Sequence, residues 1–333
     1  MAWQASWHRR SRRPPGFLVA VGLHSCHKGS GGELPVRVWP KKLVWFQVVV
    51  AALLAGIAFL FAFIPLRLGA WSAAVAIPLG AIYFLFSVRR FLRRRQLARL
   101  PFPEEWRGSL ERCVAFYRRL DAESRRRFET DVQIFLAEQR IYGVRGAEVP
   151  DDAKVLVAAS AAMLGHGMPD WEWPRVRDVV VYPATFSEDY ETGAGENIAG
   201  MVHAQGPILF SGPELRHGFC KERDGYNVGL HELAHVMDFA DGAADGVPAG
   251  AEWVARAPWI EIVADRLRRV RKGRMRRVMR DYAGKNEAEL FAVAVETFFE
   301  KPEKLRKKDK ELFEMLADYF NVDPRTGKLR EPV

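Results

Sequence analysis

The sequence predicts an α+β protein: a mostly helical domain with a small sheet, preceded by a two-helix transmembrane hairpin. Two observations lead to this prediction. Two long apolar segments lie between residues 43 and 88. Beyond residue 100, helical spacing of apolar residues dominates and only two short runs have the composition of strands. We therefore expect a disordered basic arm over 1–40, the hairpin and its basic flank over 41–100, and the second domain over 101–333.

The first apolar segment runs from Leu43 to Ile64 without a charged residue, long enough to cross a bilayer as a helix. A turn over 65–69 separates it from a second apolar run, Ala70 to Val88. Together the two runs predict the hairpin. A helical hairpin buried in a soluble core is the alternative, but buried helices rarely need such long uncharged runs. A signal peptide over Gly16–Gly22 is disfavoured because that run is too short.

The flanking charges predict the orientation of the hairpin. Lys41 and Lys42 precede the first apolar run, and six arginines between Arg89 and Arg99 follow the second. The turn between the runs carries only Arg67. The positive-inside rule therefore places both ends, and the second domain, on the cytoplasmic side of the cell (inner) membrane. The arginines would lie against anionic lipid headgroups.

The composition permits a folded core and favours anionic partners. Of the 333 residues, 49% are hydrophobic, and 50 Lys and Arg stand against 41 Asp and Glu. The three cysteines, Cys26, Cys113 and Cys220, are far apart and odd in number. No disulfide framework is expected, and a reducing compartment is the simpler interpretation.

The second domain shows helical and strand patterns in alternation. Apolar spacing predicts helices over 104–142, 153–164, 227–239, about 250–280 and 287–300, and strands over 178–182 and 206–211. Asn227 or Asp224 is the expected cap of the helix over 227–239. A basic amphipathic tail follows.

The helix over 227–239 carries the sequence His-Glu-Leu-Ala-His at 231–235. His231 and His235 are four residues apart, which places both imidazoles on one helix face. Two such nitrogens can occupy adjacent corners of a zinc tetrahedron. Glu232, beside the first histidine, can hold a zinc-activated water and take its proton. The motif therefore predicts a zinc site with hydrolytic chemistry.

A catalytic zinc needs a third protein ligand. No histidine follows His235, so a carboxylate is expected, and the helix over 287–300 offers Glu289 and Glu296. These two are seven residues apart and share a face, so one could bind zinc while the other braces a histidine. Spacing alone does not choose between them, and a solvated pair is the alternative. Asp238 could accept an imidazole N–H or cap a loop.

The segment from His231 to Asp238 resembles the Mlc titration factor family of zinc peptidases. Further similar stretches lie at Val180–Pro183, Gly206–Ser211, Asp245–Pro248 and Ala288–Phe299, so the resemblance covers about residues 100–325 but not the hairpin. The catalytic core of lethal-factor-type toxin proteases is similar too. It shares the H-E-x-x-H-x-x-D form and a tyrosine seven residues before the liganding glutamate.

This resemblance implies a zincin-like metallopeptidase domain with one zinc ion held by His231, His235 and Glu289. It also implies that Tyr282 donates its phenol O–H to the oxyanion of the tetrahedral intermediate. In zinc peptidases of this architecture an edge strand beside the active-site helix pairs with the extended substrate. The strand over 206–211 is the candidate, with Ile208, Leu209 and Phe210 in contact with substrate.

The leading functional hypothesis is a membrane-anchored zinc metallopeptidase acting on peptides or proteins, with Glu232 as general base. The sequence does not separate aminopeptidase from endopeptidase action. Since members of the resembled family are associated with sequestering a transcriptional repressor, a regulatory binding protein with zinc shaping its surface is the alternative. A basic membrane or nucleic-acid adaptor is a third hypothesis. Nucleic acid is disfavoured because the basic run over 266–280 lacks aromatic interleaving.

Overall fold

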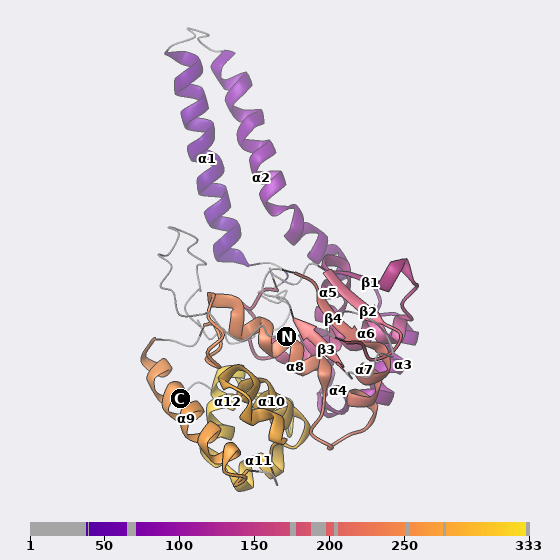
Figure 1. Ribbon diagram of the computed structural model, residues 1–333. Helices are drawn as coiled ribbons and strands as arrows, with labels where there is room; N and C mark the ends of the chain where they lie inside the picture. Colours follow the sequence, from indigo (N-terminus) through magenta and orange to yellow (C-terminus); the bar gives the residue numbers. More distant parts are fainter. Residues whose placement is uncertain are drawn as a thin grey trace.

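The computed structural model describes residues 38, 40–64, 71–173, 178–187, 198–202, 206–250, 253–275 and 278–330. Two long helices project from a mostly helical body that contains a small sheet (Figure 1), as the sequence predicts. The basic arm expected over residues 1–40 lies almost entirely outside the described residues.

The projecting helices are α1 (Lys41–Phe63) and α2 (Trp71–Leu97), and both are long and apolar enough to cross a membrane. Only 11% of the apolar stretch of α1 is buried, which argues against the alternative of a hairpin enclosed by a soluble core. The helices pack against each other, and the Tyr83 hydroxyl donates a 2.8 Å hydrogen bond to Gln47 Oε1. The amide oxygen of Gln47 in the first apolar run is thus satisfied within the hairpin.

The predicted helical stretch over 104–142 is divided into three helices. They are α3 (Glu104–Cys113), α4 (Ala115–Arg119) and α5 (Ala122–Glu138). The side chain of Asp121 accepts a hydrogen bond from the Ser124 N–H and starts α5 as a new helix. The end of this prediction is wrong, because Arg140–Gly143 form strand β1.

The sheet has four strands in the order β1-β2-β4-β3. Strands β1, β2 (Asp178–Tyr182) and β4 (Ile208–Ser211) are parallel, and β3 (Gly200–Val202) is antiparallel to β4. The register pairs Val180 of β2 and Met201 of β3 with Leu209 of β4. The two predicted strands are β2 and β4, the interior pair. Buried on both faces, they carry the apolar runs that made them recognisable.

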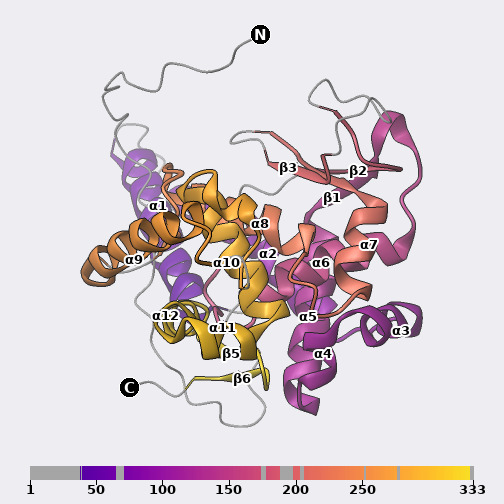
Figure 2. The same ribbon diagram turned by 60° about the horizontal axis from the view of Figure 1, so that its bottom comes forward.

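Three helices form the centre of the domain: α6 (Asp151–Gly165), α8 (Val228–Asp238) and α10 (Glu287–Glu300). Every residue of α8 is buried, because α8 packs against both α6 and α10 (Figure 2). The remaining elements are α7 (Gly212–Cys220), α9 (Trp253–Arg271), α11 (Pro302–Lys308), α12 (Lys310–Phe320), β5 (Val322–Asp323), β6 (Lys328–Leu329) and the 3₁₀ turns η1 (Val144–Gly146), η2 (Phe239–Asp241) and η3 (Asp281–Gly284).

Cys113 and Cys220 form a disulfide, so the expectation of no disulfide is wrong. The two residues are 107 positions apart in sequence but end α3 and α7, which lie in contact. Sequence separation conceals such a pair because tertiary packing of the helices brings the thiols together. A disulfide is typical of an oxidising compartment, whereas the charges that flank the hairpin predict the cytoplasmic side.

Candidate metal centre

The two motif histidines lie on α8, whose start is fixed by Asn227. The Asn227 side chain accepts the N–H of Leu230 at 3.1 Å and is the cap, in preference to Asp224. One turn into the helix, Nε2 of His231 lies 3.2 Å from Nε2 of His235. The two rings are nearly perpendicular, at 84°. Both side chains are buried, so their lone pairs converge in a region largely closed to solvent.

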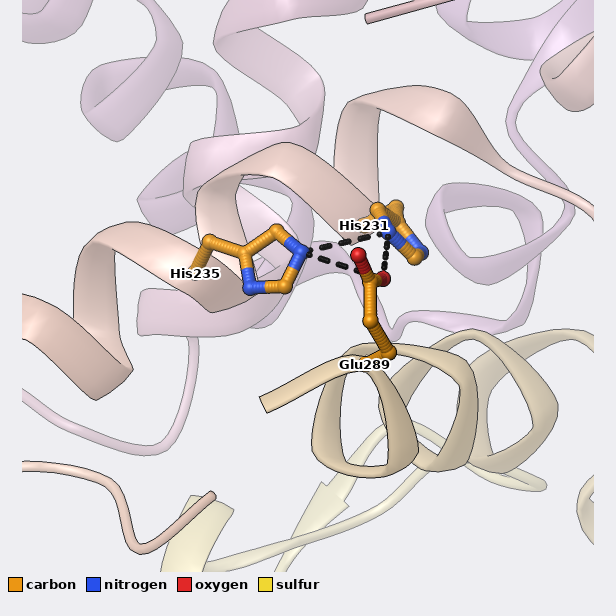
Figure 3. A group of neighbouring side chains, drawn as sticks. All are labelled: His231, His235 and Glu289. Atoms are coloured by element: carbon orange, nitrogen blue, oxygen red, sulfur yellow. Dashed lines mark hydrogen bonds and ion pairs between the residues drawn. The ribbon is translucent and has the colours of Figure 1, made fainter. Parts of the chain in front are cut away.

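Glu289 approaches the same point from α10 (Figure 3). Asn286 caps α10 by accepting the Glu289 N–H at 2.8 Å, which places Glu289 in the first turn. Its Oε2 lies 3.1 Å from Nε2 of His231 and 3.5 Å from Nε2 of His235. Within the part of the chain that the structure describes, this is the one group of three or more His, Cys, Asp or Glu side chains arranged to hold a metal ion.

The spacing of the three donor atoms fits a tetrahedral zinc ion. Zinc binds nitrogen and oxygen at about 2.0–2.1 Å, so two ligands at corners of a tetrahedron are roughly 3.3–3.4 Å apart. The observed separations of 3.1, 3.2 and 3.5 Å lie around that value. Two imidazoles and one carboxylate also match the donor set of catalytic zinc sites.

Glu296 lies behind His231, fully buried. Its Oε1 is 2.6 Å from Nδ1 of His231, and its Oε2 accepts the Asn227 N–H at 2.7 Å. The guanidinium of Arg280 donates to the same Oε1. Burial opposes a charged imidazole, but Glu296 and Glu289 outweigh it and raise the pKa of His231 to about 10. Glu289 thus faces the donor cluster, while Glu296 orients a histidine from the opposite side.

Glu232 points toward the sheet and is buried, which raises the pKa of its carboxyl. Strand β3 lies directly against it. A Cβ placed on Gly200 would lie 2.6 Å from Cγ and 2.7 Å from Oε1 of Glu232. Only glycine allows this close approach, so Gly200 is a residue of the site that sequence analysis missed. Nothing in the short Gly200–Val202 run distinguished it in the sequence.

Tyr282 lies in η3, and its hydroxyl donates to Oε1 of Glu289 at 3.0 Å. Burial of the hydroxyl and the nearby Glu289 charge raise its pKa above the ordinary value, so the O–H is retained at neutral pH. Nζ of Lys285 lies 3.4 Å from this hydroxyl and 3.7 Å from Oε1 of Glu289. Lys285 and Arg280 are polar neighbours of the site that sequence analysis missed, because neither belongs to a recognisable motif.

The prediction that Ile208, Leu209 and Phe210 form the substrate-binding edge is wrong. Their strand, β4, is paired on one side with β2 and on the other with β3. All three residues are buried, so neither their backbone nor their side chains face an open edge. Among the described residues the edge beside α8 is β3. The run over 208–210 is apolar because it forms an interior strand, which is buried on both faces.

Asp238 does not accept an imidazole N–H, one of the two roles that the sequence left open for it. Within the described residues, neither its carboxylate oxygens nor Nδ1 of His235 has a hydrogen-bond partner. Asp238 is fully buried at the end of α8, and burial raises its pKa to about 7. The backbone N–H of Gly246, in the loop after α8, partly opposes this shift, although it does not meet hydrogen-bond geometry with the carboxylate.

A buried histidine pair joined by a glutamate from a second helix, with another glutamate beside the first histidine, defines a protein of the metallopeptidase class. Residues 88–321 match the model of the family described as glucose-regulated metallo-peptidase M90. The chain belongs to this family.

The relatives agree with the resemblance to the Mlc titration factor family. The chain is 27% identical over 268 residues to an uncharacterized protein of Synechocystis, covering 75% of this chain and 96% of that protein. It is 26% identical over 243 residues to Mlc titration factor A of Salmonella typhimurium, covering 66% of this chain and 88% of the relative. The corresponding protein of Salmonella enteritidis gives the same values.

Proposed function

We propose that this protein is a membrane-anchored zinc metallopeptidase with a zincin-like fold that hydrolyses peptide bonds in peptides or proteins. The main support is that the donor atoms of His231, His235 and Glu289 converge at the spacing of a tetrahedral zinc site. The buried Glu232 lies beside them. The three residues would hold one zinc ion. Membership of a metallopeptidase family supports the reaction class.

Bound zinc would supply a Lewis acid that polarises the scissile carbonyl and makes water a stronger acid. Glu232 is the general base in this proposal. Burial raises the pKa of Glu232, so its carboxylate accepts a proton from water more readily than an exposed one would. Glu232 then carries that proton to the leaving amine. Glu296 is hydrogen-bonded to Nδ1 of His231, so that Nε2 of the same ring would face the metal.

Tyr282 is the proposed donor to the oxyanion. Its raised pKa keeps the hydroxyl protonated, and the residue is 46% exposed, so substrate can reach it. The ammonium of Lys285 lies close enough to add positive charge on the same side. An O–H donor aimed at developing negative charge stabilises the transition state by a few kcal/mol.

The proposed substrate-binding edge is β3, in place of the 208–210 segment. Among the described residues β3 pairs only with β4, and we assign its other edge, beyond the bridge between Ile198 and Phe186, to an extended peptide. Gly200 brings one face of β3 into contact with Glu232. A peptide paired with β3 would therefore pass beside the general base.

The proposed location is the inner membrane, with the peptidase domain on the cytoplasmic side. The support is the length and apolar character of α1 and α2, together with the arginines that follow the second apolar run.

The test is the substitution Glu232→Gln in the full chain, assayed on a peptide library with zinc content measured in parallel. We expect cleavage to fall by at least about 10²–10⁴-fold while one zinc per chain remains, because the amide cannot act as a base. Glu287→Gln, an exposed glutamate on α10, is the matched control and should retain activity. Full activity of Glu232→Gln would overturn the proposal. Single residues or internal fragments among the products distinguish aminopeptidase from endopeptidase action.

A second candidate function is binding of a transcriptional regulator, favoured by the name of the relative Mlc titration factor A. Here the metal cluster would shape a binding surface. The Glu232→Gln chain separates the two functions, since it should still retain such a partner in a pull-down if binding is the function. A zinc-loaded wild-type chain that cleaves no library peptide and yet retains the regulator would favour this candidate.

A further inference from the structure

The second hairpin helix continues into the peptidase domain without a linker. α2 is one helix from Trp71 to Leu97, and the family match begins inside it, at Val88. From that residue onward one face of the helix is buried, through Val88, Phe91 and Arg94 at three-residue spacing. The apolar residues nearer the tip are largely exposed. The same helix is therefore both the proposed membrane span and the first helix of the domain.

A cluster of four charges fixes the foot of this helix. We call it the foot cluster: Arg90, Arg94, Glu138 and Glu172. Nε and Nη2 of Arg94 donate to Glu138 at 2.6 and 2.8 Å, and Nη1 and Nη2 donate to Glu172 at 2.7 Å each. Arg90, one turn earlier, donates to both carboxylates as well, at 2.7 and 2.6 Å.

The foot cluster is rigid because its hydrogen bonds are directional and its two positive charges balance its two negative charges. The Arg94 side chain is only 2% exposed, and each of its carboxylate partners is held by two parallel hydrogen bonds. Burial opposes the charge of Glu138, but the arginines outweigh it and lower its pKa to about 2. The carboxylate is therefore ionised throughout the physiological range. Tilting α2 would break several charge-assisted hydrogen bonds at once.

The foot cluster is connected to the metal centre through the sheet. Glu138 is the last residue of α5 and lies two residues before the start of β1. At the far side of the sheet, β3 contacts Glu232. Three steps between neighbouring strands amount to roughly 15 Å, and Arg94 lies about 8 Å along the helix beyond Arg89. Figure 1 shows the sheet in the half of the domain that adjoins the hairpin. The site is thus on the order of 25 Å from the membrane end of α2.

We propose that the substrate is a membrane-anchored polypeptide, cleaved in the segment next to its own membrane span, on the side where the domain lies. This inference rests on the proposed peptidase function. An extended chain advances about 3.3 Å per residue, so a bond about 5–10 residues from the span reaches Glu232 best. A substrate in the same bilayer also gains effective concentration, which a soluble peptide lacks.

The test uses the full chain in lipid vesicles. A sequence that the chain cleaves in a soluble peptide library is placed about 4, 8, 16 or 32 residues from a single transmembrane helix in the same vesicles. We expect the fastest cleavage near about 8 residues and a decline of about eightfold by about 32, since effective concentration falls roughly as the −3/2 power of tether length. The soluble peptide should be cut most slowly.

A variant isolates the contribution of the rigid foot. A flexible Gly-Ser segment inserted between Phe86 and Ser87 separates the span from the docked end of α2 but leaves Val88, Arg94 and the metal centre unchanged. We expect this variant to lose the length preference and to cleave the soluble peptide at the wild-type rate. The same Gly-Ser segment added at the C-terminus is the matched control and should keep the preference.

The possible failures are distinguishable. Cleavage by the wild-type chain that is independent of tether length, or equally fast on the soluble peptide, overturns the inference and leaves the peptidase function intact. A length preference that survives the Gly-Ser insertion also overturns it, because the rigid foot would then not set the reach. Loss of cleavage of every substrate, soluble and tethered, contradicts the peptidase function itself.

Discussion

The protein contains two polar clusters in buried surroundings, and they differ in how they are satisfied. In the foot cluster, two arginines face two glutamates, and the charges cancel through short hydrogen bonds. In the metal cluster, defined as His231, His235 and Glu289, three acceptor atoms converge within 4.8 Å of one another. The foot cluster needs nothing from outside the chain, whereas the metal cluster gathers lone pairs that only protons or a cation can satisfy.

This difference separates a structural role from a functional one. Buried charges that complete each other's hydrogen bonds fix geometry, and their value lies in holding α2 on the domain. Acceptors that repel each other unless a cation joins them are costly to folding, so they indicate a ligand. The same amino acid, glutamate, serves in both clusters, and only its partners determine which role it has.

The largest effect is expected from breaking the metal cluster. Glu289→Ala removes one of three ligands, so zinc affinity should fall by more than about a hundredfold, the upper end for losing an orienting neighbour. Hydrolysis should disappear, a loss on the order of 10⁶-fold or more. Zinc content by mass spectrometry and peptide turnover check this. Glu287→Ala, two residues away and exposed, should change neither. Normal zinc content in Glu289→Ala would remove Glu289 from the site.

A smaller effect is expected from breaking the foot cluster. Arg94→Met leaves two carboxylates without their main partner, which should lower the free energy of unfolding at neutral pH by about 3–5 kcal/mol. Denaturant unfolding of the full chain in detergent measures this. Arg93→Met, a neighbour on the exposed side of the helix, is the control.

Acidification tests whether charge is the cause of that loss. The pKa of Glu138 is lowered to about 2 in the folded chain from an ordinary 4.5. Its contribution to stability is therefore complete above about pH 4.5 and is lost as pH falls toward 2. The difference between wild type and Arg94→Met should narrow over this interval. A difference that stays constant with pH would assign the loss to packing of the arginine stem instead.

The smallest effect is expected from Glu296→Gln, which compares the two glutamates of α10. Glu296→Gln keeps an oxygen that can accept from His231 but removes the charge that Arg280 and His231 both contact. Zinc affinity should weaken by about 10–100-fold, less than on loss of Glu289. Competition with a chromophoric chelator measures the affinity. An effect larger than that of Glu289→Ala would show that the roles of the two glutamates are reversed.

The parts of the site that obey a local period were predictable from sequence. His231 and His235 share a face because four residues make about one helical turn, and Glu289 and Glu296 share one because seven make two. Which glutamate faces the histidine nitrogens depends on how α10 crosses α8, which no local pattern contains. The family resemblance supplied that choice, and the observed distances agree with it.

Features that depend on strand order or on contacts between distant segments could not be predicted. The run over 208–210 is apolar whether it lies at an edge or inside, so its place in the sheet was predicted wrongly. Gly200 matters through its contact with Glu232, and Cys113 and Cys220 meet only because α3 and α7 pack together. The hairpin was the easiest element to predict, because two long uncharged apolar runs indicate long helices by length and composition alone.

The Cys113–Cys220 disulfide gives the chain a second covalent connection between the hairpin and α8. Cys113 ends the first helix after the hairpin, and Cys220 lies eleven residues before His231. A cut anywhere in the backbone between the two cysteines would leave the histidines covalently attached to α2 while the bond is closed. Where thiols are kept reduced, the same cut would sever the two halves. For a cut within this loop, release of the half that carries the histidines from the hairpin thus requires reduction as well as cleavage.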